Sequence, residues 1–214
     1  LFRSGKSTLL SMLCGLTQPE GGTITIDGVR LTKSPSAIGY MLQKDHLFEW
    51  RNIFSNISLG LEIQKRLDEP ARQELLEMMA AYGLAGFEYA KPSELSGGMR
   101  QRAALIRTLA LKPDLLLLDE PFSALDYQTR LSVCDDISSI IRQTHKTAIL
   151  VTHDLSEAIS VADRILVLSP RPGRVKKILS IDFPENCIRS LDRRNCPEFS
   201  TYFNMVWKEL KTYE

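Results

Sequence analysis

The 214-residue sequence predicts an α/β fold built on a mostly parallel sheet. Short apolar runs that suit buried strands alternate with amphipathic helical stretches, and this alternation is typical of parallel sheets covered on both faces. The run "LLLLD" at 115–119 is apolar along its whole length, which favours a strand buried on both sides. Near the start, "GKST" stands directly before a helical stretch, as in loops that bind phosphate between a strand and a helix.

The first half of the chain contains two predicted strands and a long helical block. "LLSMLCGL" (9–16) predicts a helix that ends at Gly15. "GGTITIDG" (21–28) predicts a short strand entering a turn, and "AIGYML" (37–42) a second strand that stops at Gln43. The block 52–112 is helical, with Pro70 in the first turn of one helix and Gly83 at its end. Apolar residues recur at helical spacing in that helix: Ala71, Leu75, Met78, Met79 and Tyr82.

The second half continues the alternation after the strand 115–119. A helix carries Val133, Ile137, Ile140 and Ile141 on one face. "TAILVTHD" (147–154) contains a strand, "LSEAISVAD" (155–163) a helix, and 164–169 and 174–181 two further strands. The tail 197–210 is helical, and one side of it carries Phe199, Phe203, Val206 and Leu210.

These elements predict one domain over 1–214. Its core spans about 1–43 and 113–181, an inserted helical subdomain about 44–112, and a C-terminal helical tail 182–214.

Composition is that of an ordinary globular protein, with 43% hydrophobic and 25% charged residues. The net charge of +1 gives no reason to expect nucleic acid or an anionic membrane as a partner. No apolar run approaches the roughly 18 residues that a membrane span needs. Cys14, Cys134, Cys187 and Cys196 form no CxxC pair, so we expect reduced thiols in a cytosolic protein, with Cys14 and Cys134 as small apolar core residues.

The stretch Gly5-Lys6-Ser7-Thr8 matches the second half of the phosphate loop GxxxxGK[ST]. In such a loop, backbone N–H groups and the helix N-terminus bind phosphate, Lys6 would reach the β- and γ-phosphates, and the Ser7 hydroxyl would hold Mg²⁺. Ser4 and Thr8 complete the predicted phosphate-binding residues. An ordinary strand-to-helix turn is the alternative.

Two acidic residues end the strand 115–119. Asp119 stands at the carboxyl end of a buried strand, where ligands of open α/β sheets gather, and could hold Mg²⁺. Glu120 follows and is available to polarise an attacking water as general base. The alternative is that both residues merely end the strand before Pro121.

The stretch "LSGGMRQR" (95–102) predicts a second anion site at a helix start. Ser96 is the N-cap, while Gly97 and Gly98 leave the first turn without side chains, so several N–H groups are exposed. This stretch resembles the signature motif of ATP-binding cassette (ABC) ATPases. By that resemblance Gln43 is the Q-loop glutamine, "SALD" (123–126) the D-loop, and His153 the switch histidine.

The order Lys6, Gln43, Ser96, Asp119, Asp126, His153 reproduces the ABC motifs over nearly the whole chain. The resemblance implies a P-loop NTPase core with an inserted α-helical ABC subdomain, and ATP and Mg²⁺ as cofactors. It also implies a head-to-tail dimer, in which Ser96, Gly97, Gly98 and Asp126 of one cassette contact ATP on the other. The implied catalytic residues are Glu120, His153 and Gln43, and the implied Mg²⁺ ligands are Ser7, Gln43 and Asp119.

Two longer stretches resemble importer ATPases of the nitrate/sulfonate/taurine branch: "SGGMRQRAALIRTLALKPDLLLLDEPFSALD" and "VLSPRPGRV". The implied partners are a second nucleotide-binding subunit, a transmembrane permease contacted through about 44–60, and indirectly a solute-binding protein, with no nucleic acid. The chain would lie peripherally on the cytoplasmic face of the membrane. Phe48, Trp50 and Phe54 either belong to the core or line the permease groove.

The start of the chain departs from the ABC pattern GxSGxGKST, because Phe2 and Arg3 replace its serine and second glycine. The strands and the adenine-stacking aromatic residue expected before this loop are also missing. We therefore expect an N-terminally truncated cassette whose antiparallel β subdomain is largely absent. The alternative function is a truncated or degenerate cassette that docks on a permease without efficient ATP turnover, and a soluble ABC protein of DNA repair or translation is a third reading.

Overall fold

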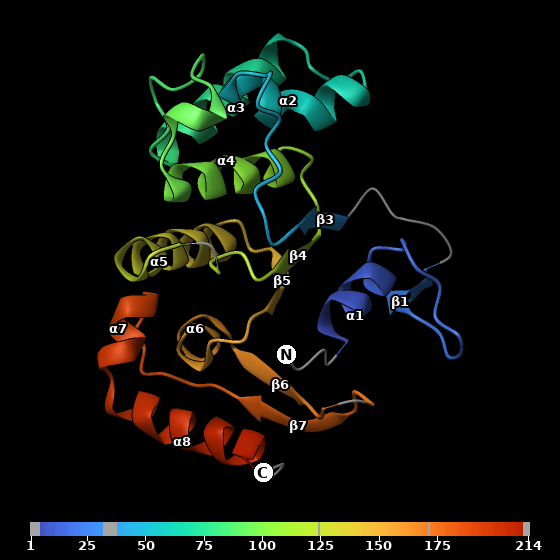
Figure 1. Cartoon of the computed structure of the whole chain (residues 1–214), viewed down its shortest axis with the longest axis vertical. Coiled ribbons are helices and arrows are strands. Elements are labelled where there is room, and N and C mark those ends of the chain that lie inside the picture. Colours follow the sequence, from blue (N-terminus) through green and yellow to red (C-terminus); the bar gives the residue numbers. More distant parts are fainter. Residues whose placement is uncertain (1–4, 32–37, 124, 171, 212–214) are drawn as a thin grey trace. The chain divides into compact units, whose positions relative to one another are not determined.

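The computed structural model describes residues 5–31, 38–123, 125–170 and 172–211 (Figure 1). The chain forms two compact units, one made of Leu1–Ser34 with Leu150–Glu214 and the other of Pro35–Ile149. The predicted division into core, helical subdomain and tail stays a prediction.

A three-stranded sheet of order β3-β4-β5 belongs mostly to the Pro35–Ile149 unit. β3 (Ile38–Met41) pairs in parallel with β4 (Leu115–Asp119), so that Tyr40 lies opposite Leu117 and Met41 opposite Leu118. β5 (Thr147–Val151) follows as the third strand. Leu116, Leu117 and Leu118 are at most 1% exposed, as the apolar run predicted. The predicted α/β class with a parallel sheet is therefore confirmed.

The predicted helical block between β3 and β4 contains α2 (Ile53–Ile63), α3 (Glu69–Ala81), the 3-10 helix η1 (Pro92–Glu94) and α4 (Gly97–Leu109). Side chains start these helices, since Asn52 and Asp68 accept hydrogen bonds from Ser55 N and Ala71 N. Gly83 follows α3 at φ 70°, as its predicted role as helix terminator requires. The helices share one apolar core, formed by Ile53, Ile57, Leu75, Met79, Leu84, Ala103 and Ile106 among others. α5 (Tyr127–Gln143) buries Val133, Ile137 and Ile140.

The three aromatic residues after Gln43 separate in the structure. Phe54 is buried at 7% exposure, whereas Trp50 is 73% exposed. Phe48 is half-buried, and its ring centroid lies 4.7 Å from that of Trp50. Phe54 is therefore a core residue, and Trp50 is not.

The other unit begins with α1 (Lys6–Leu13) and a short antiparallel hairpin. Its strands β1 (Thr25–Ile26) and β2 (Val29–Arg30) are joined by Asp27 and Gly28, whose φ values of 50° and 77° suit a tight hairpin turn. The short strand that the sequence predicted to enter a turn within 21–28 is β1, and β2 after the turn was not predicted.

The C-terminal part of this unit contains α6 (Leu155–Val161), β6 (Arg164–Leu168), β7 (Val175–Ser180), α7 (Ser190–Asn195) and α8 (Pro197–Lys211). β6 and β7 pair antiparallel, because no crossover helix lies between them. On α8, Val206 is buried in the core of this unit and Phe199 and Phe203 pack against it. The predicted apolar face is wrong for Leu210, which is 43% exposed. No helix in the described ranges is long and apolar enough to span a membrane.

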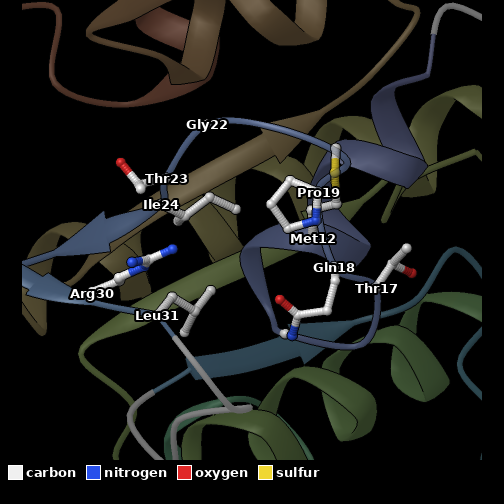
Figure 2. Close-up of a pocket in the computed structure, with 10 residues that line it drawn as sticks. Met12, Thr17, Gln18, Pro19, Gly22, Thr23, Ile24, Arg30 and Leu31 are labelled. Atoms are coloured by element: carbon white, nitrogen blue, oxygen red, sulfur yellow. The ribbon is translucent and has the colours of Figure 1, made fainter.

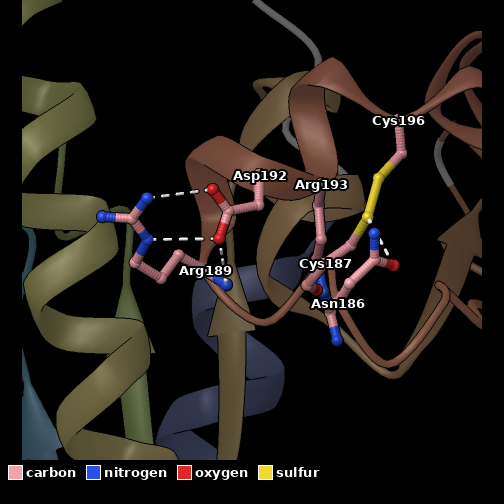
Figure 3. The surroundings of a disulfide bond; sticks show 6 residues. All are labelled: Asn186, Cys187, Arg189, Asp192, Arg193 and Cys196. Carbon is pink, nitrogen blue, oxygen red and sulfur yellow. Dashed lines mark hydrogen bonds and ion pairs between the residues drawn. A yellow bond between two sulfur atoms is a disulfide. The ribbon is translucent and has the colours of Figure 1, made fainter.

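The expectation of four reduced cysteines is wrong for two of them. Cys187 and Cys196 form a disulfide that brackets α7 (Figure 3). Inside this bracket Arg193 is 6% exposed and donates to the carbonyl oxygen of Ala162 at 3.2 Å, which anchors α7 beside the end of α6. The nine-residue separation gave no sign of this pairing, which depends on how α7 folds. Cys14 and Cys134 are free and buried, as expected.

Replacing Gly39 by Ala tests the close packing of β3. A Cβ atom at this position would lie 2.6 Å from Thr108 Cγ2 and 2.9 Å from the Pro113 ring, both of which are held in place. We expect Gly39→Ala to lower the free energy of unfolding by about 1–3 kcal/mol in urea denaturation. Gly21→Ala is the control, because its Cβ would meet no atom within 4 Å. Equal stability of the two variants would contradict this packing.

Candidate functional site

The first turn of α1 carries the predicted phosphate-binding residues Lys6, Ser7 and Thr8. Gly5 is the N-cap at φ 80°, a conformation that favours glycine, and it has no side chain to cover the N–H groups of this turn. Ser7 and Thr8 are exposed. Among the described residues no side chain caps this helix start, and an anion site requires such an uncapped start. The predicted Ser4, and the divergent Phe2 and Arg3, lie outside the described residues.

The predicted Gln43 and Glu120 meet at the carboxyl edge of the β3–β4 pair. Gln43 Nε2 donates to Glu120 Oε2 at 3.2 Å and lies 3.4 Å from Ser123 Oγ. The Ser123 hydroxyl in turn donates to the carbonyl oxygen of Glu120 at 3.0 Å. Glu120 has φ 46°, so its backbone is in the left-handed region that non-glycine residues rarely adopt.

Asp119 lies beside this pair and is 7% exposed. The Tyr40 hydroxyl, on the neighbouring strand, donates to Asp119 Oδ2 at 3.4 Å. Sequence reasoning gave Tyr40 no role. Its position on β3, shortly before Gln43, was the available signal, since neighbouring parallel strands bring such residues to one edge.

The predicted signature residues start α4. Ser96 is the N-cap, and its hydroxyl accepts from Met99 N at 3.3 Å. Gly98 is buried against α5, where a Cβ atom would lie 2.7 Å from Thr129 Cγ2 and 3.0 Å from Val133 Cγ2. Glycine at 98 is therefore required for close packing of α4 on α5, independently of its predicted contact with nucleotide. At Gly97 a Cβ would come within 3.2 Å of Leu125 Cδ2, so this position is also tight.

Asp126 of the predicted D-loop is the N-cap of α5. Its Oδ1 accepts from Thr129 N at 3.1 Å. Hydrogen bonds from the Thr129 side chain and backbone lower the pKa of Asp126. A carboxylate at this position also interacts favourably with the positive end of the helix.

His153 is exposed between β5 and α6 in the unit that also contains α1. The residues around it are ordered by hydrogen bonds. Thr152 Oγ1 donates to the buried Glu157 at 2.5 Å and accepts from Asp154 N at 3.0 Å, and Asp154 caps α6. The predicted site residues thus fall into two groups: Lys6, Ser7 and His153 in one unit, and Gln43, Ser96, Asp119, Glu120 and Asp126 in the other.

A small cavity of about 90 Å³ lies at the C-terminal end of α1, beside the β1–β2 hairpin (Figure 2). Met12, Gln18, Pro19 and Arg30 help to line it, and it contains none of the predicted site residues. In the described part of the chain no three His, Cys, Asp or Glu side chains cluster as metal ligands. The predicted Mg²⁺ ligands are a hydroxyl, an amide and one carboxylate, a set of hard oxygen donors that Mg²⁺ accepts when phosphate and water complete its shell.

A family model described as "ABC transporter" matches residues 4–123, which is more than half of the chain. The chain belongs to this family. The taurine import ATP-binding protein TauB of Yersinia pestis is 42% identical over 84% of this chain and 70% of its own length. The nitrate import ATP-binding protein NrtD of Synechocystis is 40% identical over 99% of this chain and 81% of its own length.

A solved structure extends the likeness to the fold. The ABC cassette MJ0796, in a dimeric post-hydrolysis state bound to ADP and Pi, matches with a TM-score of 0.69 and 28% identity over 84% of this chain and 82% of that one. The chain therefore has the P-loop NTPase α/β fold of an ABC cassette, as the sequence predicted.

The Asp126 cap predicts a local dependence of stability on pH. Because its pKa is lowered in the folded state, the carboxylate stabilises the fold at pH values above its ordinary pKa of about 4, and this stabilisation is lost as the pH falls through the lowered pKa. Asn at this position keeps an acceptor oxygen but does not titrate. We expect wild type to lose more stability than Asp126→Asn between about pH 5 and about pH 2, measured by urea midpoints. Parallel pH profiles of the two proteins would contradict the assignment.

Proposed function

We propose that this chain is the Mg²⁺-dependent, ATP-hydrolysing subunit of an importer for a small anion or organic solute. The observation that carries the proposal is the hydrogen bond between Gln43 and Glu120 beside the buried Asp119. This arrangement joins a carboxylate that can act as general base to an amide that can orient water, at the sheet edge where α/β folds bind ligands.

Each side chain has a role in this chemistry. The α1 N-terminus and Lys6 bind the β- and γ-phosphates, so that negative charge meets N–H groups and an ammonium. Glu120 accepts a proton from the attacking water, Gln43 orients that water, and His153 contacts the γ-phosphate. Bound Mg²⁺ would neutralise phosphate charge, and Ser7, Gln43 and Asp119 are the residues that would hold it.

The second phosphate-binding helix start favours a dimer. Ser96, Gly97 and Gly98 start α4 in one unit, whereas Lys6 starts α1 in the other. In a head-to-tail pair the α4 start and Asp126 of one cassette would close on the nucleotide of its partner. The neighbour MJ0796 is dimeric and carries ADP and Pi, which supports this assembly.

The permease surface is proposed to lie at about 44–60, on the cytoplasmic side of the membrane. Trp50 projects there with 73% of its surface exposed, and aromatic anchors of this kind dominate helix-binding grooves. Asn56 holds the loop beneath it: this fully buried amide accepts from Phe48 N at 2.7 Å and donates to Phe48 O and Arg51 O at 3.0 and 3.2 Å. Trp50 is therefore presented by a fixed backbone.

The solute is proposed only as a class. The taurine and nitrate import relatives are 42% and 40% identical to this chain, so similarity does not choose between their solutes. A separate solute-binding protein and the permease would make that choice.

Glu120→Gln tests the general base. Glutamine keeps the size of the side chain but cannot accept the proton, so ATP turnover should fall at least about 100-fold while ATP affinity stays within about threefold. Glu77→Gln on α3 is the control and should keep wild-type turnover, because the exposed Glu77 side chain accepts, within the described part of the chain, from Gln73 on the same helix alone. Turnover that survives Glu120→Gln would contradict the assignment, and an inactive wild type would favour the degenerate-cassette alternative.

Trp50→Ala tests the permease surface. Loss of an exposed aromatic anchor should weaken binding to the co-expressed permease at least about tenfold in detergent pull-downs, with basal ATP turnover unchanged. Ile188→Ala is the control, since Ile188 is 65% exposed in the other unit. Equal permease binding by both variants would exclude Trp50 as an anchor.

A further inference from the structure

Residues 43–47, here called the connecting segment, join the β3 edge to the helical core. Its first residue, Gln43, bonds to Glu120 and Ser123. Its last residue, Leu47, is 7% exposed and belongs to the apolar core of α2, α3 and α4. Both ends of the segment are therefore held, Gln43 by side-chain hydrogen bonds and Leu47 by apolar packing.

Arg107 on α4 holds the middle of the connecting segment. Its Nη1 donates to the carbonyl oxygen of His46 at 2.8 Å and its Nη2 to that of Asp45 at 2.6 Å. One planar guanidinium thus fixes two successive carbonyls, at a place where His46 has φ 46°. Burial lowers the pKa of Arg107 while the nearby Asp45 charge raises it, and the group remains charged at neutral pH.

Arg100 makes the second contact from α4 to the same segment. Its Nε lies 3.1 Å from Asp45 Oδ2, and Asp45 Oδ1 accepts from Leu47 N at 3.2 Å. Arg100 and Arg107 are seven positions apart, which places both on one face of the helix. The Asp45 carboxylate therefore makes one hydrogen bond within the connecting segment, to Leu47 N, and one ion pair with α4, to Arg100.

These contacts connect two predicted site motifs that lie in the same compact unit, the signature residues at the start of α4 and Gln43. α4 starts at the signature residues Ser96 and Gly97, and the connecting segment starts at Gln43. A 13-residue helix with regular hydrogen bonds moves as a rigid body, so a displacement of its start also displaces Arg100 and Arg107.

We propose that Arg107, with Asp45 and Arg100, forms a positioning clamp that makes Gln43 follow the movement of α4. The clamp couples closure of the α4 start on nucleotide to the orientation of Gln43 beside Glu120. Arg107 bonds to backbone carbonyls, so it is a positioning residue. This inference rests on the proposed ATPase function and adds to it a coupling that the ABC motifs by themselves do not specify.

The test compares Arg107→Met with Arg107→Lys in the full chain. Methionine keeps the length and apolar contacts but removes both hydrogen bonds, and lysine restores the charge without the planar fork. For Arg107→Met we expect kcat to fall about three- to thirtyfold with KM within about twofold of wild type. Amide hydrogen exchange across 43–47 should accelerate, and ATP-dependent protection across 97–102 should be lost. Arg107→Lys should give intermediate values.

Two further variants keep the test decisive. Asp45→Ala removes both the ion pair with Arg100 and the acceptor of Leu47 N but retains every backbone carbonyl, so it should accelerate exchange at Leu47 and lower kcat less, even if Arg107→Met fails to fold. Arg66→Met is the matched control, because the Arg66 side chain is exposed and, among the described residues, its guanidinium bonds to Gln64 alone, so this variant should match wild type throughout.

The clamp is overturned if folded Arg107→Met shows wild-type exchange across 43–47, or wild-type kcat, or if Asp45→Ala leaves exchange at Leu47 unchanged. Exchange across 43–47 is also measured without nucleotide. Failure of the ATPase assignment, seen as unchanged turnover in Glu120→Gln, is thereby distinguished from failure of the clamp.

Discussion

The parallel pairing of β3 with β4 is the constraint on which the proposed catalytic edge depends. Its register puts Met41 opposite Leu118, so both strands reach their carboxyl ends together and Gln43 arrives beside Asp119 and Glu120. Close packing at Gly39 specifies this register, because a one-residue slip of β3 would bring Ile38 or Tyr40 to a position where even a Cβ atom would lie 2.6 Å from Thr108 Cγ2. The register in turn sets the distance between amide and carboxylate.

Several motif residues serve packing and capping as well as the proposed chemistry. Gly98 admits α5 at a distance that no Cβ would allow, while Ser96 and Asp126 cap α4 and α5. These two helices carry the residues that the proposal assigns to the opposite nucleotide. The local rules that start the helices thus also fix the surface that a second cassette would contact.

Much of the fold could be predicted from the sequence because its signals are local. The apolar run at 115–119, the capping Asp68 before Pro70 and the terminator Gly83 each specify an element by themselves. The Cys187–Cys196 disulfide was missed because pairing depends on the path of the chain around α7. Leu210 was placed wrongly because helical periodicity does not show where a helix leaves the core. The motifs assigned roles to Gln43 and Glu120, but the contact between them depends on strand pairing, which no motif encodes.

Arg107 shows most clearly what sequence patterns conceal. It stands in the mostly apolar stretch "ALIRTLAL", where it reads as one polar position on an otherwise buried helix. Its importance follows only from the carbonyls that face it, because a half-buried cation is stable in a protein when its donors are satisfied. Beyond the connecting segment, Asn56 satisfies the polar groups of the loop that presents Trp50 in the same way. Between Gln43 and Trp50 the backbone is thus held at successive points by side chains of α4 and α2. A chain fixed in this way can transmit a displacement that a free loop would absorb.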